Sequence, residues 1–150
     1  MILNMRVSGL PHCPRNRSHT IIKKGKTAFL GKTEAARAYE LSLRHHLKKF
    51  QVAAESFKNN FNKNTQHLHA TWIFSSPEVT TSTGKISETG TDLDSHKVLQ
   101  DVVMGFVGIN DAYIVVDKRS KVVGPYDVQV TLSIHDNDWV NGEELLWPDF

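Results

Sequence analysis

The stretch DSHKVLQDVVMGFVGINDAYIVV (94–116) decides the expected fold, because a helix pattern in it leads directly into a strand pattern. Apolar residues in its first part recur at a spacing that is compatible with a helix: Val98, Val102, and Met104 or Phe106. The following AYIVV (112–116) has the composition of a strand, and so does the alternating HLHATWIFSS (67–76) earlier in the chain. A strand–helix–strand unit of this kind predicts two parallel strands.

The flanking sequence adds further elements. ILNMRVSGLP (2–11) predicts a short strand, whereas the basic, Pro- and Gly-punctuated residues 12–33 predict an irregular loop. We expect Thr33 to cap a helix over residues 34–50, which carries an apolar stripe at three- and four-residue spacing: Ala36, Tyr39, Leu43, Leu47 and Phe50. Residues 126–136 predict a last strand, antiparallel to the one before it.

Together these elements predict an α/β fold with a small mixed β-sheet and helices packed on it. A single domain over residues 1–150 is expected, because this length suits one hydrophobic core. The Ser-, Thr- and Gly-rich segment 77–91 predicts an exposed, mobile loop. The acidic and aromatic tail 137–150 has no pattern that predicts an element.

The composition excludes several classes of protein. No apolar run approaches the roughly 20 residues that span a bilayer, and we expect no secretory signal in the N-terminal MILNMRVSGL. The single cysteine, Cys13, excludes an intrachain disulfide and a cysteine-based zinc ribbon. A lone cysteine also fits a reducing, cytoplasmic location.

Charge is distributed unevenly along the chain. Residues 1–63 carry 13 Lys and Arg against 3 Asp and Glu, a balance of +10, whereas residues 64–150 carry 5 against 13, a balance of −8. A basic half attracts polyanions such as nucleic acid, and an acidic half concentrates the carboxylates that hard divalent cations prefer. Alternatively, the two halves neutralise each other across the fold or across a dimer interface.

Asp92 and Asp94 are the first candidates for a metal site. An extended backbone would place both carboxylates on one face, with Leu93 pointing into the core. Two adjacent carboxylates repel each other unless a divalent metal, a lysine or solvent offsets their charge. Either aspartate could instead cap the following helix, as Ser95 could, although a cap requires only one residue.

Asp111 and Lys97 extend this candidate site. Asp111 precedes the 112–116 strand, and three carboxylates converging at strand ends would suit Mg²⁺ or Mn²⁺. The alternative for Asp111 is a turn formed with Asn110. Lys97 lies about one helical turn beyond Asp94 and could neutralise a scissile phosphate, or it could form an ion pair with Asp101 at i+4.

Three stretches, in order over about residues 5–135, resemble one known family. SGLPHCPRNRSH (8–19) has a strand end, a turn and the Asn16-Arg17 pair, and KTAFLGKTEAARAYELSL (26–43) has a basic strand that leads into a helix. TDLDSHKVLQDVV and GINDAYIVV supply an Asp-x-Asp, a lysine, a helix and an aspartate that precedes a strand. This arrangement resembles RusA-type Holliday junction resolvases, which are small dimeric endodeoxyribonucleases of bacteria and their phages.

The resemblance implies roles for the acidic site. Asp92, Asp94 and Asp111 would hold a catalytic Mg²⁺, with Mn²⁺ as an alternative, and Lys97 would be the catalytic lysine. The chain differs from the family pattern at Ser95, where the family has asparagine. Lys97 also follows Asp94 by three residues, where the family has a spacing of four.

The resemblance further implies a two-fold homodimer that cuts four-way DNA junctions in recombination and repair. The location would be the cytoplasm of a bacterial cell or of a phage-infected host. Expected DNA-binding residues are Arg15, Asn16, Arg17, Lys23, Lys24, Lys26, Lys32 and Lys85. Two alternatives stay open: a non-catalytic basic DNA-binding module whose aspartates are caps and turn residues, and a metal-dependent nuclease without junction preference.

Overall fold

The computed structural model describes residues 1–13, 19–89, 93 and 96–138. Within these ranges, four strands form the main sheet: β1 (Ile2–Ser8), β4 (Gln66–Ser76), β5 (Ile114–Val123) and β6 (Asp127–Asp136). Their order is β1-β6-β4-β5, with β4 and β5 parallel and the other two pairings antiparallel. The predicted small α/β fold with a mixed sheet is therefore confirmed.

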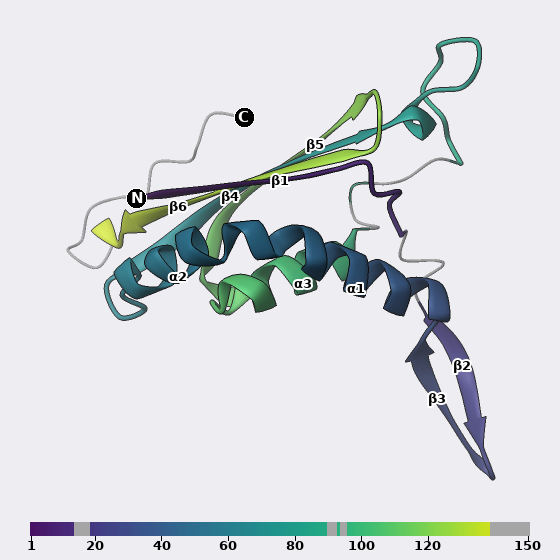
Figure 1. Cartoon of the computed structure of the whole chain (residues 1–150), viewed down its shortest axis with the longest axis horizontal. Coiled ribbons are helices and arrows are strands. Elements are labelled where there is room, and N and C mark those ends of the chain that lie inside the picture. Colours follow the sequence, from purple (N-terminus) through teal and green to yellow (C-terminus); the bar gives the residue numbers. More distant parts are fainter. Residues whose placement is uncertain (14–18, 90–92, 94–95, 139–150) are drawn as a thin grey trace.

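The α-helices of the described part of the chain lie together on one side of this sheet (Figure 1): α1 (Glu34–Leu47), α2 (Gln51–Asn60) and α3 (Lys97–Val107). Thr33 caps α1 as predicted, because its hydroxyl oxygen accepts a hydrogen bond from the Ala36 N–H at 3.1 Å. A short 3₁₀ turn, η2 (Lys48–Phe50), joins α1 to α2. None of the helices in the described ranges is long and apolar enough to cross a membrane.

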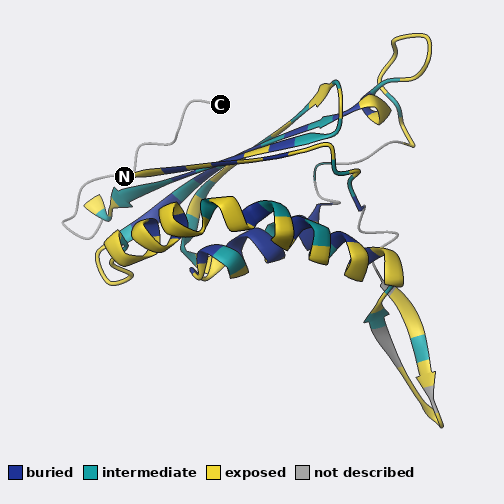
Figure 2. Ribbon diagram, viewed as in Figure 1, coloured by how far each residue is buried: buried dark blue, intermediate teal, exposed yellow. Residues whose placement is uncertain are grey.

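The core lies between the helical layer and the sheet (Figure 2). In β4 every second residue is buried from Leu68 to Ser76, and Trp72 and Phe74 are each only 1% exposed. The predicted helix stripe faces these strands, with Leu43 and Leu47 fully buried. Alternate residues of β4 and residues at three- and four-residue spacing in α1 are buried, so the apolar faces of both elements pack into one core.

The parallel pair β4 and β5 is joined through α3, as the sequence predicts. Six of the eleven residues of α3 are buried, which explains how a helix rich in β-branched valines is stabilised by packing. Gly108 ends the helix in the left-handed conformation, with φ 79°. This is the common way for a helix to satisfy its last carbonyl groups.

The prediction of an irregular loop over residues 12–33 is wrong for its second half. Strands β2 (His19–Lys24) and β3 (Thr27–Lys32) form an antiparallel hairpin that extends from the domain next to the start of α1 (Figure 1). The turn contains Gly25, whose φ of 65° is accessible to glycine without steric cost. Gly25-Lys26 is therefore the two-residue turn of a hairpin, which the basic composition of this segment made hard to recognise in the sequence.

Strand β6 runs antiparallel to β5, as predicted, but it does not pair with that strand. It lies between β1 and β4 instead, where Val128, Val130 and Leu132 are at most 3% exposed. Strand β5 takes the edge of the sheet, and its charged residues suit that place: Asp117, Lys118, Arg119 and Lys121. The alternating apolar residues of β6 therefore suit a strand that lies inside the sheet, between β1 and β4.

The segment from residue 77 is exposed for most of its described length, as expected. It begins with the turn η3 (Pro77–Val79), and an isolated bridge pairs Thr80 with Ile86. Its last two residues, 90 and 91, lie outside the described part of the chain. The mobility of this segment stays a prediction.

Candidate active site

A cavity of about 160 Å³ lies where α3 packs on the edge of the sheet. Its walls come from α3, β4, β5 and the short turn η5 (Asp111–Tyr113), and the residues that line it are Trp72, Lys97, Gln100, Met104, Asp111, Ile114, Asp117 and Arg119. Lys97 and Asp111, two of the residues that the sequence singles out, are brought together here.

Secondary structure explains why these side chains meet. The parallel register pairs Trp72 with Arg119 and Ala70 with Asp117, on the face that the helices cover. Because side chains alternate along a strand, Asp117 and Arg119 point to the same side. Lys97, Gln100 and Met104 follow one another at three- and four-residue spacing and so share one face of α3.

Lys97 lies between two carboxylates. Its ammonium group is 3.0 Å from the Asp101 carboxylate and 3.8 Å from the Asp111 carboxylate. The side chains are about half exposed, at 49% for Lys97 and 58% for Asp111. The site therefore stays open to a charged ligand from solvent.

The other two predicted metal ligands, Asp92 and Asp94, lie outside the described residues, as does Ser95. The next residue, His96, is 3% exposed and stacks on Phe74 with ring centroids 3.9 Å apart. Burial, together with the nearby charges of His12 and Arg119, lowers the pKa of His96 to about 3. His96 is thus a neutral core residue that fixes the start of α3.

Asp117 and Arg119 are site residues that the sequence reasoning missed. The Asp117 carboxylate accepts hydrogen bonds from the Arg119 guanidinium at 2.7 Å from Nη2 and 3.1 Å from Nε. The available signal was their i, i+2 spacing in a strand, which places both on one face. It was overlooked because the predicted strand ended at residue 116.

Two buried donors in the cavity walls are without a partner among the described residues: Nε1 of Trp72 and Nε2 of Gln100. An unpaired buried N–H group costs about 1–3 kcal/mol. Native proteins normally satisfy such groups with water or a ligand.

A divalent metal fits this site only in part. Within the described ranges, no group of three or more His, Cys, Asp and Glu side chains is placed to hold a metal ion. The cavity contributes Asp111, whose exposed carboxylate suits an oxygen-preferring cation, and Asp117, which is already bonded to Arg119. A complete oxygen site would need further ligands, such as Asp92 and Asp94.

Three histidines form a separate cluster on the open face of the sheet. His69 stacks on His135 with ring centroids 3.6 Å apart, and Nε2 of His69 lies 3.1 Å from Nε2 of His67. His67 also hydrogen-bonds the Asn137 side chain at 2.8 Å. Stacked rings direct their nitrogen lone pairs along parallel planes, so His69 and His135 are poorly arranged to share a metal.

The predicted DNA-binding residues fall into several places. Lys23 and Lys26 are exposed on the β2–β3 hairpin, and Lys85 is exposed in the segment that follows η3. Lys32 forms an ion pair with Glu40 of α1. The backbone of Lys24 belongs to β2, whereas Arg15, Asn16 and Arg17 lie outside the described residues.

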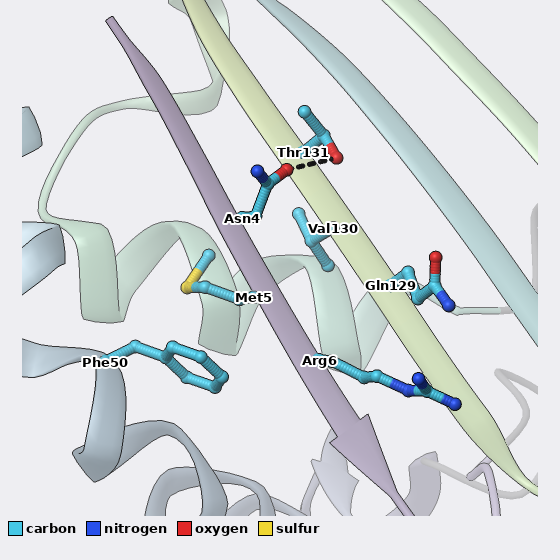
Figure 3. A pocket seen from close by; sticks show the side chains of 7 residues that line it. All are labelled: Asn4, Met5, Arg6, Phe50, Gln129, Val130 and Thr131. Carbon is cyan, nitrogen blue, oxygen red and sulfur yellow. Dashed lines mark hydrogen bonds between the residues drawn. The ribbon is translucent and has the colours of Figure 1, made fainter.

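A larger cavity, of about 330 Å³, lies at the opposite edge of the sheet, on β1 and β6 (Figure 3). Asn4 and Thr131 are joined there by a hydrogen bond of 2.8 Å. Arg6 is the charged residue of its lining, and its guanidinium already pairs with Asp127 at 2.9 Å. This lining lacks the acid and lysine pair found beside α3.

Comparison with known proteins adds no assignment. No protein-family model matches the chain, and no curated protein is significantly similar to it.

Proposed function

We propose that the chain is a metal-dependent endodeoxyribonuclease that cuts branched DNA, in the manner of the RusA-type resolvases that its sequence resembles. The observation that carries the proposal is the 3.8 Å approach of Lys97 to Asp111 in an open cavity. These residues belong to different elements, and the resemblance assigns both to the catalytic site. Their proximity supports the roles that the resemblance implies for Lys97 and Asp111.

In this proposal Asp111 holds a Mg²⁺ ion together with Asp92 and Asp94. When bound, the ion supplies an activated water and stabilises charge on the scissile phosphate. Asp111 lies at the start of η5, where the side chain of Asn110 accepts a hydrogen bond from the Ala112 N–H at 2.9 Å. This cap fixes the backbone that carries the carboxylate.

Lys97 acts on the phosphate. Its ammonium group has three N–H donors and no acceptor, so it binds an anionic oxygen and offsets negative charge that develops in the transition state. Contacts with the carboxylates of Asp101 and Asp111 hold this ammonium group at the lining of the cavity. Removing such a donor typically lowers the rate about 10²–10³-fold.

The basic residues of the first half bind the DNA backbone. Lys23 and Lys26 are exposed on a hairpin that extends from the domain, so they reach phosphates away from the cavity. A homodimer with two-fold symmetry would present two such sites to a four-way junction. Paired cleavage then follows from matched symmetry of protein and junction.

The experiment is cleavage of a labelled synthetic four-way junction in Mg²⁺, compared with a linear duplex of the same sequence. Wild-type protein should nick the junction symmetrically and leave the duplex uncut. Asp111→Asn should abolish cleavage while junction binding in Ca²⁺ persists. Asp136→Asn, an exposed aspartate at the end of β6, is the matched control and should cleave normally.

One observation favours a second candidate, a DNA-binding module without catalysis. Lys97 lies closer to Asp101 than to Asp111, as an ordinary i, i+4 ion pair would. Junction binding with no cleavage in Mg²⁺ or Mn²⁺ would support this candidate and contradict the nuclease. Equal cleavage of junction and duplex would indicate a nuclease without junction preference.

A further inference from the structure

The cavity beside α3 contains polar groups that the proposed roles of Lys97 and Asp111 do not use. Trp72 is 1% exposed, and its indole Nε1 has no hydrogen-bond partner in the part of the chain that the structure describes. On the facing helix α3, the side-chain Nε2 of Gln100 is also buried and also lacks a hydrogen-bond partner among the described residues. Both residues line the cavity, and both unpaired atoms are N–H donors.

Arg119 adds a cation to this donor set. The β4–β5 register places it directly beside Trp72, and its side chain is 26% exposed. Two of its N–H groups bond the same carboxylate oxygen of Asp117, at 3.1 and 2.7 Å. Asp117 therefore orients the guanidinium, which is the usual protein partner of phosphate oxygens.

The chemistry of these atoms selects the class of ligand. N–H donors cannot coordinate a metal ion, so the unpaired atoms of Trp72 and Gln100 require an acceptor. A guanidinium beside them favours an acceptor with negative charge. A phosphate oxygen meets both requirements.

We propose that Trp72, Gln100 and Arg119 form a phosphate subsite, which holds a non-bridging oxygen of a DNA phosphodiester next to Lys97 and Asp111. The identification of the phosphate as that of DNA rests on the proposed nuclease function. Asp117 is a positioning residue in this subsite, because it acts through Arg119.

The test is a titration of the ¹⁵N-labelled full chain with dimethyl phosphate, a minimal phosphodiester, followed through the indole N–H signals. The chain has three tryptophans, and Trp72→Phe identifies the signal of Trp72. We expect this signal to move saturably with dimethyl phosphate, while sodium chloride at the same ionic strength leaves it in place. Inorganic phosphate in a parallel titration separates diester binding from binding of the free ion.

Two neighbouring cations on β5 supply a matched pair of variants. Arg119→Gln should weaken dimethyl phosphate binding about tenfold or more, because it removes a charged donor. Lys118→Gln removes the same charge from the opposite face of the strand and should leave the affinity unchanged. Gln100→Met, which keeps the side-chain length, should weaken binding without removing a charge.

Each outcome decides the inference separately from the nuclease. An immobile Trp72 signal, or equal effects of Arg119→Gln and Lys118→Gln, would overturn it and leave water as the occupant of the cavity. A response to inorganic phosphate alone would overturn the diester assignment. If the Trp72 signal responds as expected but no junction is cut, the subsite stands and the nuclease proposal fails.

Discussion

Asp101 and Asp111 lie on either side of one ammonium group, that of Lys97, at 3.0 and 3.8 Å. The first contact is a local pair within α3, whereas the second links the helix to the turn that begins β5. A lysine held in this way can act in the structure, in catalysis or in both. Substitution of the lysine and of its local partner separates these roles.

Lys97→Gln should lower junction cleavage by about 10²-fold or more, because it removes the donor that offsets charge on the phosphate. The measurement is single-turnover cleavage of the four-way junction in Mg²⁺. Asp101→Asn is the control, since it breaks only the i, i+4 pair, which contributes about 0.2–0.5 kcal/mol. It should cleave close to the wild-type rate. Similar rates for both variants would show that Lys97 is only structural.

Gly105 and Gly108 of the same helix should respond to alanine with opposite signs. Gly105 lies inside α3 with nothing within 4 Å of an added Cβ, so Gly105→Ala should stabilise the protein by about 0.5–1 kcal/mol. Gly108 has a φ of 79°, so Gly108→Ala should destabilise it by about 1–2 kcal/mol. Urea unfolding followed by circular dichroism measures both, and changes of the same sign would contradict the assigned end of α3.

Much of the fold could be predicted because local patterns coincide with the final packing. Thr33 and the apolar stripe of α1 predicted a capped helix, which the structure has. Residues 68–76 predicted a strand, and every second residue of this segment is buried in the core. The position of β6 could not be read in this way. Strand order depends on which strand edges pair in space, and β6 pairs with β1 and β4, which are both far from it in the sequence.

The candidate site could be predicted only where a motif marks it. Lys97 and Asp111 were found through the Asp-x-Asp pattern and its spacing, and they do meet. Arg119 and Trp72 carry no such motif, because their proximity arises from the register of two strands far apart in sequence. Trp72 is only 1% exposed, as a core residue is, yet its indole nitrogen is unpaired in the described structure.

DNA affinity should depend on the hairpin lysines according to whether each is already paired. The double substitution Lys23→Gln and Lys26→Gln should weaken binding and flatten the dependence of log K on log salt by about 2, which is roughly 0.9 for each lost phosphate contact. Fluorescence anisotropy of a labelled junction in Ca²⁺, at several salt concentrations, gives the slope. Lys32→Gln, whose lysine pairs with Glu40, should change the slope less. An unchanged slope in the double variant would remove the hairpin from the DNA-binding surface.

The stacked pair His69 and His135 should make the folded state sensitive to acid. Burial lowers the pKa of His69 to about 4, and repulsion from His135 and His67 contributes. Burial also lowers the pKa of His135, again with repulsion from His67. An unfolded histidine titrates near 6.5, so between about pH 6.5 and 4 the unfolded chain binds more protons than the folded one. The contribution of the cluster to stability is therefore complete above pH 6.5 and is lost as the pH falls through this window.

His69→Gln tests this dependence, because glutamine does not titrate. Urea unfolding midpoints measured from pH 7.5 to pH 4.5 should fall less steeply for the variant than for the wild type. His45→Gln, which removes an exposed histidine from α1, should keep the wild-type slope. If the slopes of all three proteins coincide, the acid sensitivity comes from other groups and the histidine cluster does not control it.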